Sequence, residues 1–345
     1  MVVAEARFEA GPRHWAVRVA PGLAVAVLVA IAATVVGTLF PLVGAPVFGV
    51  VLGALAGAAI PACRGQRLAA GYAVAGRTVL QLSIVVLGAG LSLRQVVAVG
   101  VGSLPVMLGT LTVALGGAFL LGRLLGVRGD TQTLIAVGTG ICGASAIAAT
   151  SAVIKPRQAD VAYALGTIFT FNIVAVLLFP PIGHLLGMNP HAFGLWAGTA
   201  VNDTSSVVAA SFAYGGDAGT FGVVVKLTRT LMLIPIVVVL AVLTARRSAT
   251  GGEVSLPWRR IVPVFLLGFL ATATLATVGV VPVAWHAAIA AVGTFLITTA
   301  LAGIGLSLRL SDMRAAGVRP LLLGGLLWLA VAASSLGLQA VTGTL

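Results

Sequence analysis

Apolar segments about as long as a membrane-spanning helix follow one another along nearly the whole chain. A spanning helix needs about 20 mainly apolar residues. The sequence contains eleven such segments, at roughly 22–40, 42–60, 76–93, 103–122, 131–153, 160–182, 192–213, 219–244, 261–279, 284–308 and 320–341. This pattern predicts an all-α integral membrane protein with about eleven transmembrane helices, in which the first two segments could instead form a re-entrant pair.

Composition supports the membrane assignment and excludes most soluble classes. Of 345 residues, 59% are hydrophobic and 8% are charged, whereas soluble domains carry about 25% charged residues. The net charge of +12 does not indicate nucleic-acid binding, because the basic residues fall in short loops between apolar segments. We expect a single membrane domain over 1–345, with residues 1–20 as a cytoplasmic tail, and no cofactor or metal site.

The basic residues also predict an orientation. With the N-terminus in the cytoplasm, eleven crossings place 15 Lys and Arg residues of the tail and loops inside and 3 outside, namely Arg94, Lys155 and Arg157. Cytoplasmic loops carry an excess of Lys and Arg. We therefore expect a multi-pass protein of the bacterial inner membrane with a cytoplasmic N-terminus and an external C-terminus.

Two internal matches suggest a duplicated architecture. "GLSLR" occurs at 90–94 and at 305–309, and the match extends to eight identities over twenty residues. The copies would run in opposite directions across the membrane, as in many secondary transporters. This predicts inverted-repeat halves at roughly 42–182 and 190–341. Shared helix-exit sequence is the alternative explanation.

The second match joins two unusually polar stretches inside apolar segments. "GTGICGASAIAA" (138–149) matches "GTAVNDTSSVVAA" (198–210) at an offset of 60 residues. Glycine lowers helix propensity, and Asn, Asp, Ser and Thr favour helix N-caps. Each stretch therefore predicts a broken helix that restarts near Ser145 or Thr204, and we expect the two broken helices to cross at mid-membrane. Alternatively, the hydroxyl groups bond back to helix carbonyls and only pack.

Facing breaks would form an anion site, because free N–H groups and positive dipole ends gather at helix N-termini. "VVVKLTRTLMLIP" (223–235) adds two cations three residues apart on one helix face. Either they face the cavity, pairing with Asp203 when it is empty, or they snorkel to the outer interface. The predicted substrate-binding residues are Thr139, Gly140, Gly143, Ser145, Asn202, Thr204, Ser205, Lys226 and Arg229.

Asp203 is the one carboxylate that we place inside a span. A charge at mid-membrane costs about 2.5–3.5 kcal/mol on insertion scales, so it needs a partner, a proton or an ion. We expect Asp203, with Asn172, to hold a coupling ion. The alternatives are a helix N-cap for Asp203 and helix-to-helix contact for Asn172.

The two polar stretches and the "VKLTRTLML" segment, in this order, resemble the YeiH-like family of proposed sulfate exporters. The resemblance covers nearly the whole chain from about residue 20. It implies a carrier built from two inverted bundles with broken helices. The family's substrate name rests on genetic context.

These observations favour a secondary active transporter of a small anion, with sulfate or an organosulfonate as candidates and H+ or Na+ as coupling ion. Its partners would then be the anion, the coupling ion and the lipid bilayer, and a homo-oligomer is left open. An anion channel is one alternative. An intramembrane enzyme using Ser145, Asp203 or Cys142 is less favoured, because no histidine lies near mid-membrane to act as a base. We therefore do not expect an enzyme.

Overall fold

The computed structural model describes residues 12–39, 45–247, 263–307 and 318–345, and all the regular structure in these ranges is helical. The main helices are α2 (Pro12–Leu39), α3 (Ala45–Ala59), α4 (Gln66–Val74), α5 (Leu80–Gly88), α6 (Leu93–Leu125), α7 (Asp130–Gly140), α8 (Ala144–Ile154), α9 (Gln158–Leu185), α10 (Pro190–Ala200), α11 (Thr204–Tyr214), α12 (Ala218–Leu231), α13 (Leu233–Arg247), α15 (Val264–Thr277), α16 (His286–Ser307) and α17 (Val318–Thr342). Three short elements complete the list, namely η1 (Pro61–Arg64), η2 (Ala75–Val79) and η3 (Val283–Trp285).

Each of the eleven predicted segments has a helical counterpart. Within the described residues, seven helical runs are long and apolar enough to span a membrane: Ala16–Leu39, Gln66–Gly88, Leu93–Leu125, Ala159–Leu185, Ala218–Leu243, His286–Ser307 and Val318–Thr342. The N-terminal boundary was predicted too late. Helix α2 already begins at Pro12, so the predicted tail of 1–20 is helical over its second half. The linker-like stretch 245–260 lies largely outside the described residues.

The chain divides into two compact units. One comprises Met1–Ser92 and Phe269–Leu308, and the other comprises Leu93–Gly268 and Arg309–Leu345. Each unit combines parts of both predicted repeat halves. The single membrane domain and the inverted repeats stay predictions.

In the first unit, glycines allow α3 and α16 to approach closely. A Cβ atom on Gly49, Gly53 or Gly57 would lie 2.9, 2.5 or 3.0 Å from the carbonyl oxygens of Thr298, Ala302 and Leu306. Glycines four residues apart form one face of a helix, and such stripes let membrane helices pack backbone to backbone.

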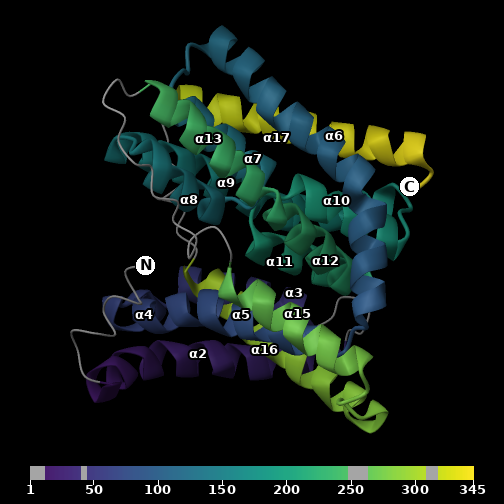
Figure 1. Ribbon diagram of the computed structural model, residues 1–345. Helices are drawn as coiled ribbons and strands as arrows, with labels where there is room; N and C mark the ends of the chain where they lie inside the picture. The colour runs from purple at the N-terminus through teal and green to yellow at the C-terminus, as the bar shows by residue number, and fades with distance from the viewer. Residues whose placement is uncertain (1–11, 40–44, 248–262, 308–317) are drawn as a thin grey trace. The chain divides into compact units, whose positions relative to one another are not determined.

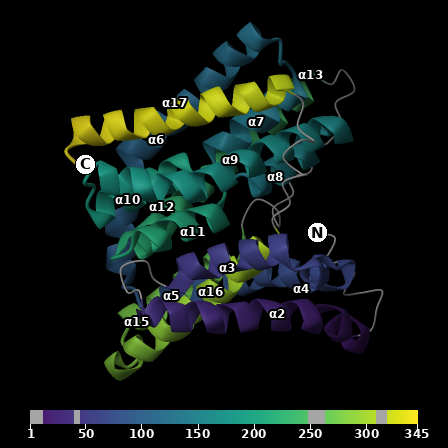
Figure 2. The ribbon, with the colours of Figure 1, turned by 180° about the vertical axis from the view of Figure 1, so that it is seen from behind.

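In the second unit, α6 and α17 pack against each other, and Figures 1 and 2 show them side by side in both views. Gly109 of α6 faces Leu338 of α17, whereas Gly117 faces Leu327. The helices are therefore antiparallel. Helix α6 contains residues 93–109 of the first matched segment and α17 contains residues 318–324 of the second, and over these parts the opposite directions agree with the predicted inversion.

The two polar stretches form broken helices, as predicted. Helices α7 and α8 each have 11 residues and are separated by 141–143, and α10 and α11 each have 11 residues and are separated by 201–203. All four boundaries of the second pair follow those of the first by 60 residues. The sequence match at this offset therefore corresponds to a repeated structure.

The predicted eleven crossings count each broken helix as one crossing, but each broken helix folds back on itself. Thr131, in the first turn of α7, donates a hydrogen bond of 2.6 Å to Asp160, in the first turn of α9. Since α9 starts just after α8 ends, the two ends of the α7–α8 segment lie together. Gly138 and Ile147 also contact each other across the break. We call this segment hairpin 1.

The α10–α11 segment folds back in the same way, and we call it hairpin 2. Tyr214, the last residue of α11, stacks on Phe193 near the start of α10 with ring centroids 3.9 Å apart, and its hydroxyl donates to the Met188 carbonyl oxygen. It also stacks on His184, near the end of α9.

The open ends of the two hairpins, opposite their tips, lie at opposite ends of α9. The open end of hairpin 1 contacts the start of this helix, and the open end of hairpin 2 contacts its end. Figures 1 and 2 show α8 and α10 toward opposite ends of α9. Helix α9 has 28 residues and is about 42 Å long. Each 11-residue half-helix reaches roughly 16 Å, and the tips contact α9 near its middle, at Ile168 and Asn172.

Candidate functional site

The candidate site lies in the second unit, where the tips of the two hairpins touch. Gly143 has φ +64°, and a Cβ on this residue would lie 3.3 Å from both the Cα and the Cβ of Asp203. The left-handed backbone conformation and the close approach both favour glycine. Non-helical backbone at membrane depth is tolerated where protein buries it or where it lines a wet cavity.

Two buried cations from α12 hold the tips. Lys226 Nζ donates a hydrogen bond of 2.7 Å to the Val201 carbonyl oxygen in hairpin 2. Arg229 Nε donates one of 2.6 Å to the Gly140 carbonyl oxygen in hairpin 1. Both side chains have 0% exposure, which excludes snorkelling to an interface.

The two accepting carbonyls belong to helix ends. Gly140 is the last residue of α7, and Val201 is the C-cap of α10. The last carbonyls of a helix lack intrahelical partners and carry the negative end of the dipole. The two cations therefore neutralise the C-terminal ends of α7 and α10. The N-terminal ends of α8 and α11 lie beside these cations.

The Arg229 guanidinium group is only partly satisfied. Within the described residues, its Nη1 and Nη2 atoms are buried and have no hydrogen-bond partner. Leaving a buried donor on a charged group unpaired costs more than about 1–3 kcal/mol. Two free nitrogens on one planar fork match the oxygens of a bidentate oxyanion.

Asp203 has a different position from the one expected. It is the N-cap of α11: its Oδ2 accepts a hydrogen bond of 3.0 Å from the Ser205 backbone N–H, and it also accepts from the Ser205 hydroxyl. Within the described residues, Asp203 does not form the expected ion pair with Lys226 or Arg229. The ion pair found there joins Arg157 to Asp160. The N-cap alternative is therefore the one observed.

Asn172 connects the middle of α9 to hairpin 2. Its Oδ1 accepts a hydrogen bond of 3.2 Å from the Asp203 backbone N–H, as expected for contact between helices. Its Nδ2 is buried without a partner in the described part of the chain, so it offers a second unused donor.

The remaining predicted residues divide by burial. Thr139 and Asn202 are buried, and Thr139 Oγ1 and Asn202 Oδ1 have no partner among the described residues. Thr204 is half-buried at the start of α11. Ser145 is exposed in the first turn of α8, so the buried cluster at the tips does not include its side chain.

Sequence reasoning missed Val201. Its contribution is a backbone carbonyl, and no side-chain signal could have shown it. It also missed the Thr131–Asp160 hydrogen bond that closes hairpin 1. The two residues are 29 positions apart and belong to different predicted segments.

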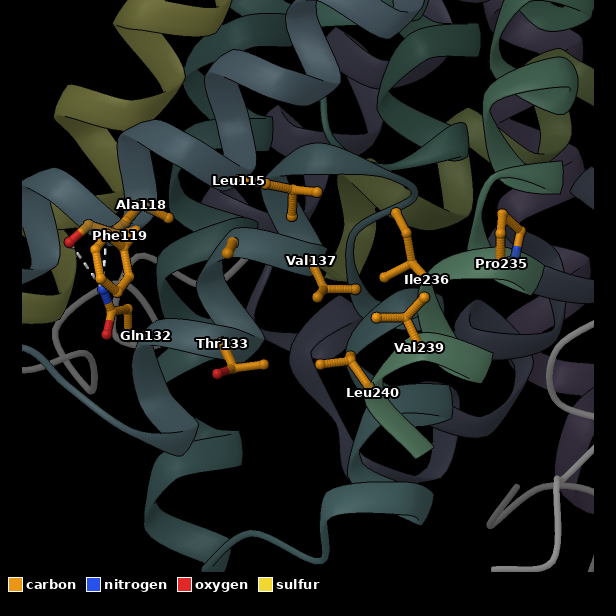
Figure 3. A pocket seen from close by; sticks show the side chains of 11 residues that line it. Leu115, Ala118, Phe119, Gln132, Thr133, Val137, Pro235, Ile236, Val239 and Leu240 are labelled. Carbon is orange, nitrogen blue, oxygen red and sulfur yellow. Dashed lines mark hydrogen bonds between the residues drawn. The ribbon is translucent and has the colours of Figure 1, made fainter. Parts of the chain in front are cut away.

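A pocket of about 360 Å³ beside hairpin 1 does not fit an anion. Figure 3 shows side chains of α6, α7 and α13 around it, and most of them are apolar, including Leu115, Val137, Ile236 and Val239. The Gln132 side chain already donates to the Ala118 carbonyl. The pocket has no charged lining residue, so the hairpin tips remain the candidate anion site.

Comparisons with known proteins identify the family. The family model described as "Conserved hypothetical protein 698" matches residues 21–324. A UPF0324 membrane protein of Streptococcus agalactiae is 39% identical over 332 residues, which cover 94% of this chain and 98% of that protein. A UPF0324 membrane protein of Fusobacterium nucleatum is 37% identical over 342 residues, with coverages of 93% and 98%. No solved structure matches the chain. The chain therefore belongs to the UPF0324 family of multi-pass membrane proteins, which includes the YeiH-like proteins.

Proposed function

We propose that this protein is a secondary active transporter that binds a small anion at the tips of the two hairpins. The observation that carries the proposal is the fully buried Arg229 guanidinium group, whose Nη1 and Nη2 have no partner within the described residues. An anion bound there would satisfy both nitrogens and balance the charge.

The charge around the tips favours a negative solute. Lys226 and Arg229 supply two cations, and the nearby Asp203 supplies one carboxylate. Asn172 Nδ2 adds a buried unpaired donor within the described residues. The N-terminal turn of α8 adds N–H groups without intrahelical partners, and its N-cap is a glycine with no side-chain oxygen.

Arginine binds carboxylates, sulfates and phosphates through two parallel hydrogen bonds. We therefore include sulfate and organosulfonates as the first candidates, in agreement with the family resemblance. Asp203 is the group that we assign to H+ coupling, because a half-buried carboxylate beside the anion site could exchange a proton during each cycle.

Two features support a carrier cycle in the bacterial inner membrane. The open ends of the two hairpins lie at opposite ends of α9, and the proposed anion site lies at their tips. The division into two compact units provides bodies that could move relative to each other during alternating access.

The test is flux of labelled sulfate into proteoliposomes, for wild type and for Lys226→Ala, Arg229→Ala and Asp203→Asn. Arg123→Ala is the matched control, because it removes an exposed cation of α6 away from the tips. We expect flux in wild type and control and a loss of at least tenfold in Arg229→Ala, since a hydrogen bond to a charged group contributes about 1.5–3 kcal/mol. Equal flux in Arg229→Ala would contradict the site, and no flux of any small oxyanion by wild type would contradict the function.

A further inference from the structure

The carbonyl ends of α7 and α10 have the chemistry of cation sites. In carriers with discontinuous helices, unwound backbone carbonyls and half-helix C-terminal ends coordinate the coupling cation. Here the corresponding groups are the Gly140 and Val201 carbonyl oxygens at the two tips. Each of them accepts a hydrogen bond from a cationic side chain of α12.

The geometry at Val201 resembles ion binding. The Lys226 ammonium group is a compact charge that lies 2.7 Å from the carbonyl oxygen. Asp203 follows Val201 by two residues and forms no ion pair with Lys226 among the described residues. A carbonyl oxygen and a nearby carboxylate are oxygen ligands suited to a hard cation.

On this basis we propose that Lys226 and Arg229 are resident counter-cations. They fill the two carbonyl sites where a coupling Na+ would otherwise bind, so the hairpin tips keep their positive charge without a dissolved metal ion. The inference deepens the proposed function, on which it rests, by removing Na+ from the coupling scheme and leaving H+.

The proposal predicts a latent Na+ site. Lys226→Ala would remove the ammonium group and leave space beside the Val201 carbonyl, where Na+ could enter. Lys226→Met would remove the same charge but keep most of the side-chain volume. The two variants therefore separate loss of charge from access to the carbonyl.

The experiment measures Tm of the purified full-length protein in NaCl and in choline chloride at equal ionic strength. A ligand that binds only the folded state raises Tm in a saturable way. We expect equal Tm values in the two salts for wild type and Lys226→Met, and a saturable rise with Na+ for Lys226→Ala. Ethylammonium, which imitates the lost side chain, should also raise Tm of Lys226→Ala.

A saturable Na+-specific rise in wild type, or equal responses of Lys226→Ala and Lys226→Met, would overturn the proposal. If Lys226→Ala does not fold, two measurements on wild type test the proposal. These are the Tm in NaCl against choline chloride, and anion flux with Na+ replaced by choline. Flux that requires Na+ would contradict the resident-cation role and leave the proposed transport function intact. Absence of flux in both salts would contradict the transport function, and the Tm comparison would still test the resident cations.

Discussion

Arg229 and Lys226 are among the largest fully buried side chains of the described residues. Isolated charges are expensive to bury, and buried charges are normally paired or hydrogen-bonded. Here each cation has one short bond to a helix-end carbonyl, and the Arg229 terminal nitrogens have none within the described residues. Retaining such groups is expected where they bind a charged solute.

Asp203 is the N-cap of α11 and the residue proposed for H+ coupling, and substitutions at this position separate the two roles. Asn is as good an N-cap as Asp, whereas loss of the cap costs about 1 kcal/mol. Asp203→Asn should therefore unfold near the wild-type temperature, and Asp203→Ala should unfold at a lower temperature, as measured by thermal unfolding in detergent. If Asp203→Asn were as destabilised as Asp203→Ala, the cap would not explain the stability contribution of this residue.

The sequence singled out three charged residues for the candidate site but did not predict the partners of the two cations. Asp203, Lys226 and Arg229 stand out because few charges lie inside apolar segments. The partners of the cations are carbonyls of Val201 and Gly140, and every residue has a carbonyl. Side-chain chemistry therefore favoured an ion pair with Asp203, which the structure contradicts.

At the scale of elements, local sequence predicted the helix breaks but not the direction of the chain after them. Gly140, Gly143 and Asn202 to Thr204 disfavour helix and favour caps, and the helices end and restart there. A break at mid-segment leaves the second half free to continue or to return. The choice depends on tertiary contacts such as Thr131 with Asp160.

Gly143 tests the hairpin tip directly. In Gly143→Ala, the alanine would have to keep the positive φ of this position, and its Cβ would lie 3.3 Å from Asp203. We therefore expect the free energy of unfolding to fall by about 1–3 kcal/mol. Gly102→Ala is the control, because a Cβ there meets nothing within 4 Å on the exposed face of α6. Thermal unfolding should show a lower Tm for Gly143→Ala alone. An unchanged Tm in both variants would contradict a close contact between the tips.

At the scale of the whole molecule, the fold-back changes the predicted topology. If α9 spans the membrane, the loops before α7 and after α8 lie on the same side. Lys155 and Arg157 then join the cytoplasmic residues, and the distribution of loop and tail cations changes from 15 against 3 to 17 against 1. This stronger asymmetry agrees better with the excess of Lys and Arg in cytoplasmic loops.

Cysteine labelling measures this topology. In a background without Cys63 and Cys142, we expect Arg128→Cys and Lys155→Cys, both at exposed positions, to be shielded from an impermeant maleimide in intact cells. Asp217→Cys, exposed at the opening of hairpin 2, should be labelled. Opposite accessibility of positions 128 and 155 would show that hairpin 1 crosses the membrane.

The most direct test of the account is equilibrium binding of oxyanions to the purified protein, followed by thermal shift, in wild type, Arg229→Lys and Arg229→Ala. The predicted result is a saturable rise in Tm of wild type with sulfate or another oxyanion. Arg229→Lys should respond at anion concentrations at least tenfold higher, because lysine keeps the charge but loses the planar fork, and Arg229→Ala should not respond. An equal rise in all three proteins, or none in wild type with any oxyanion, would contradict an anion site at the hairpin tips.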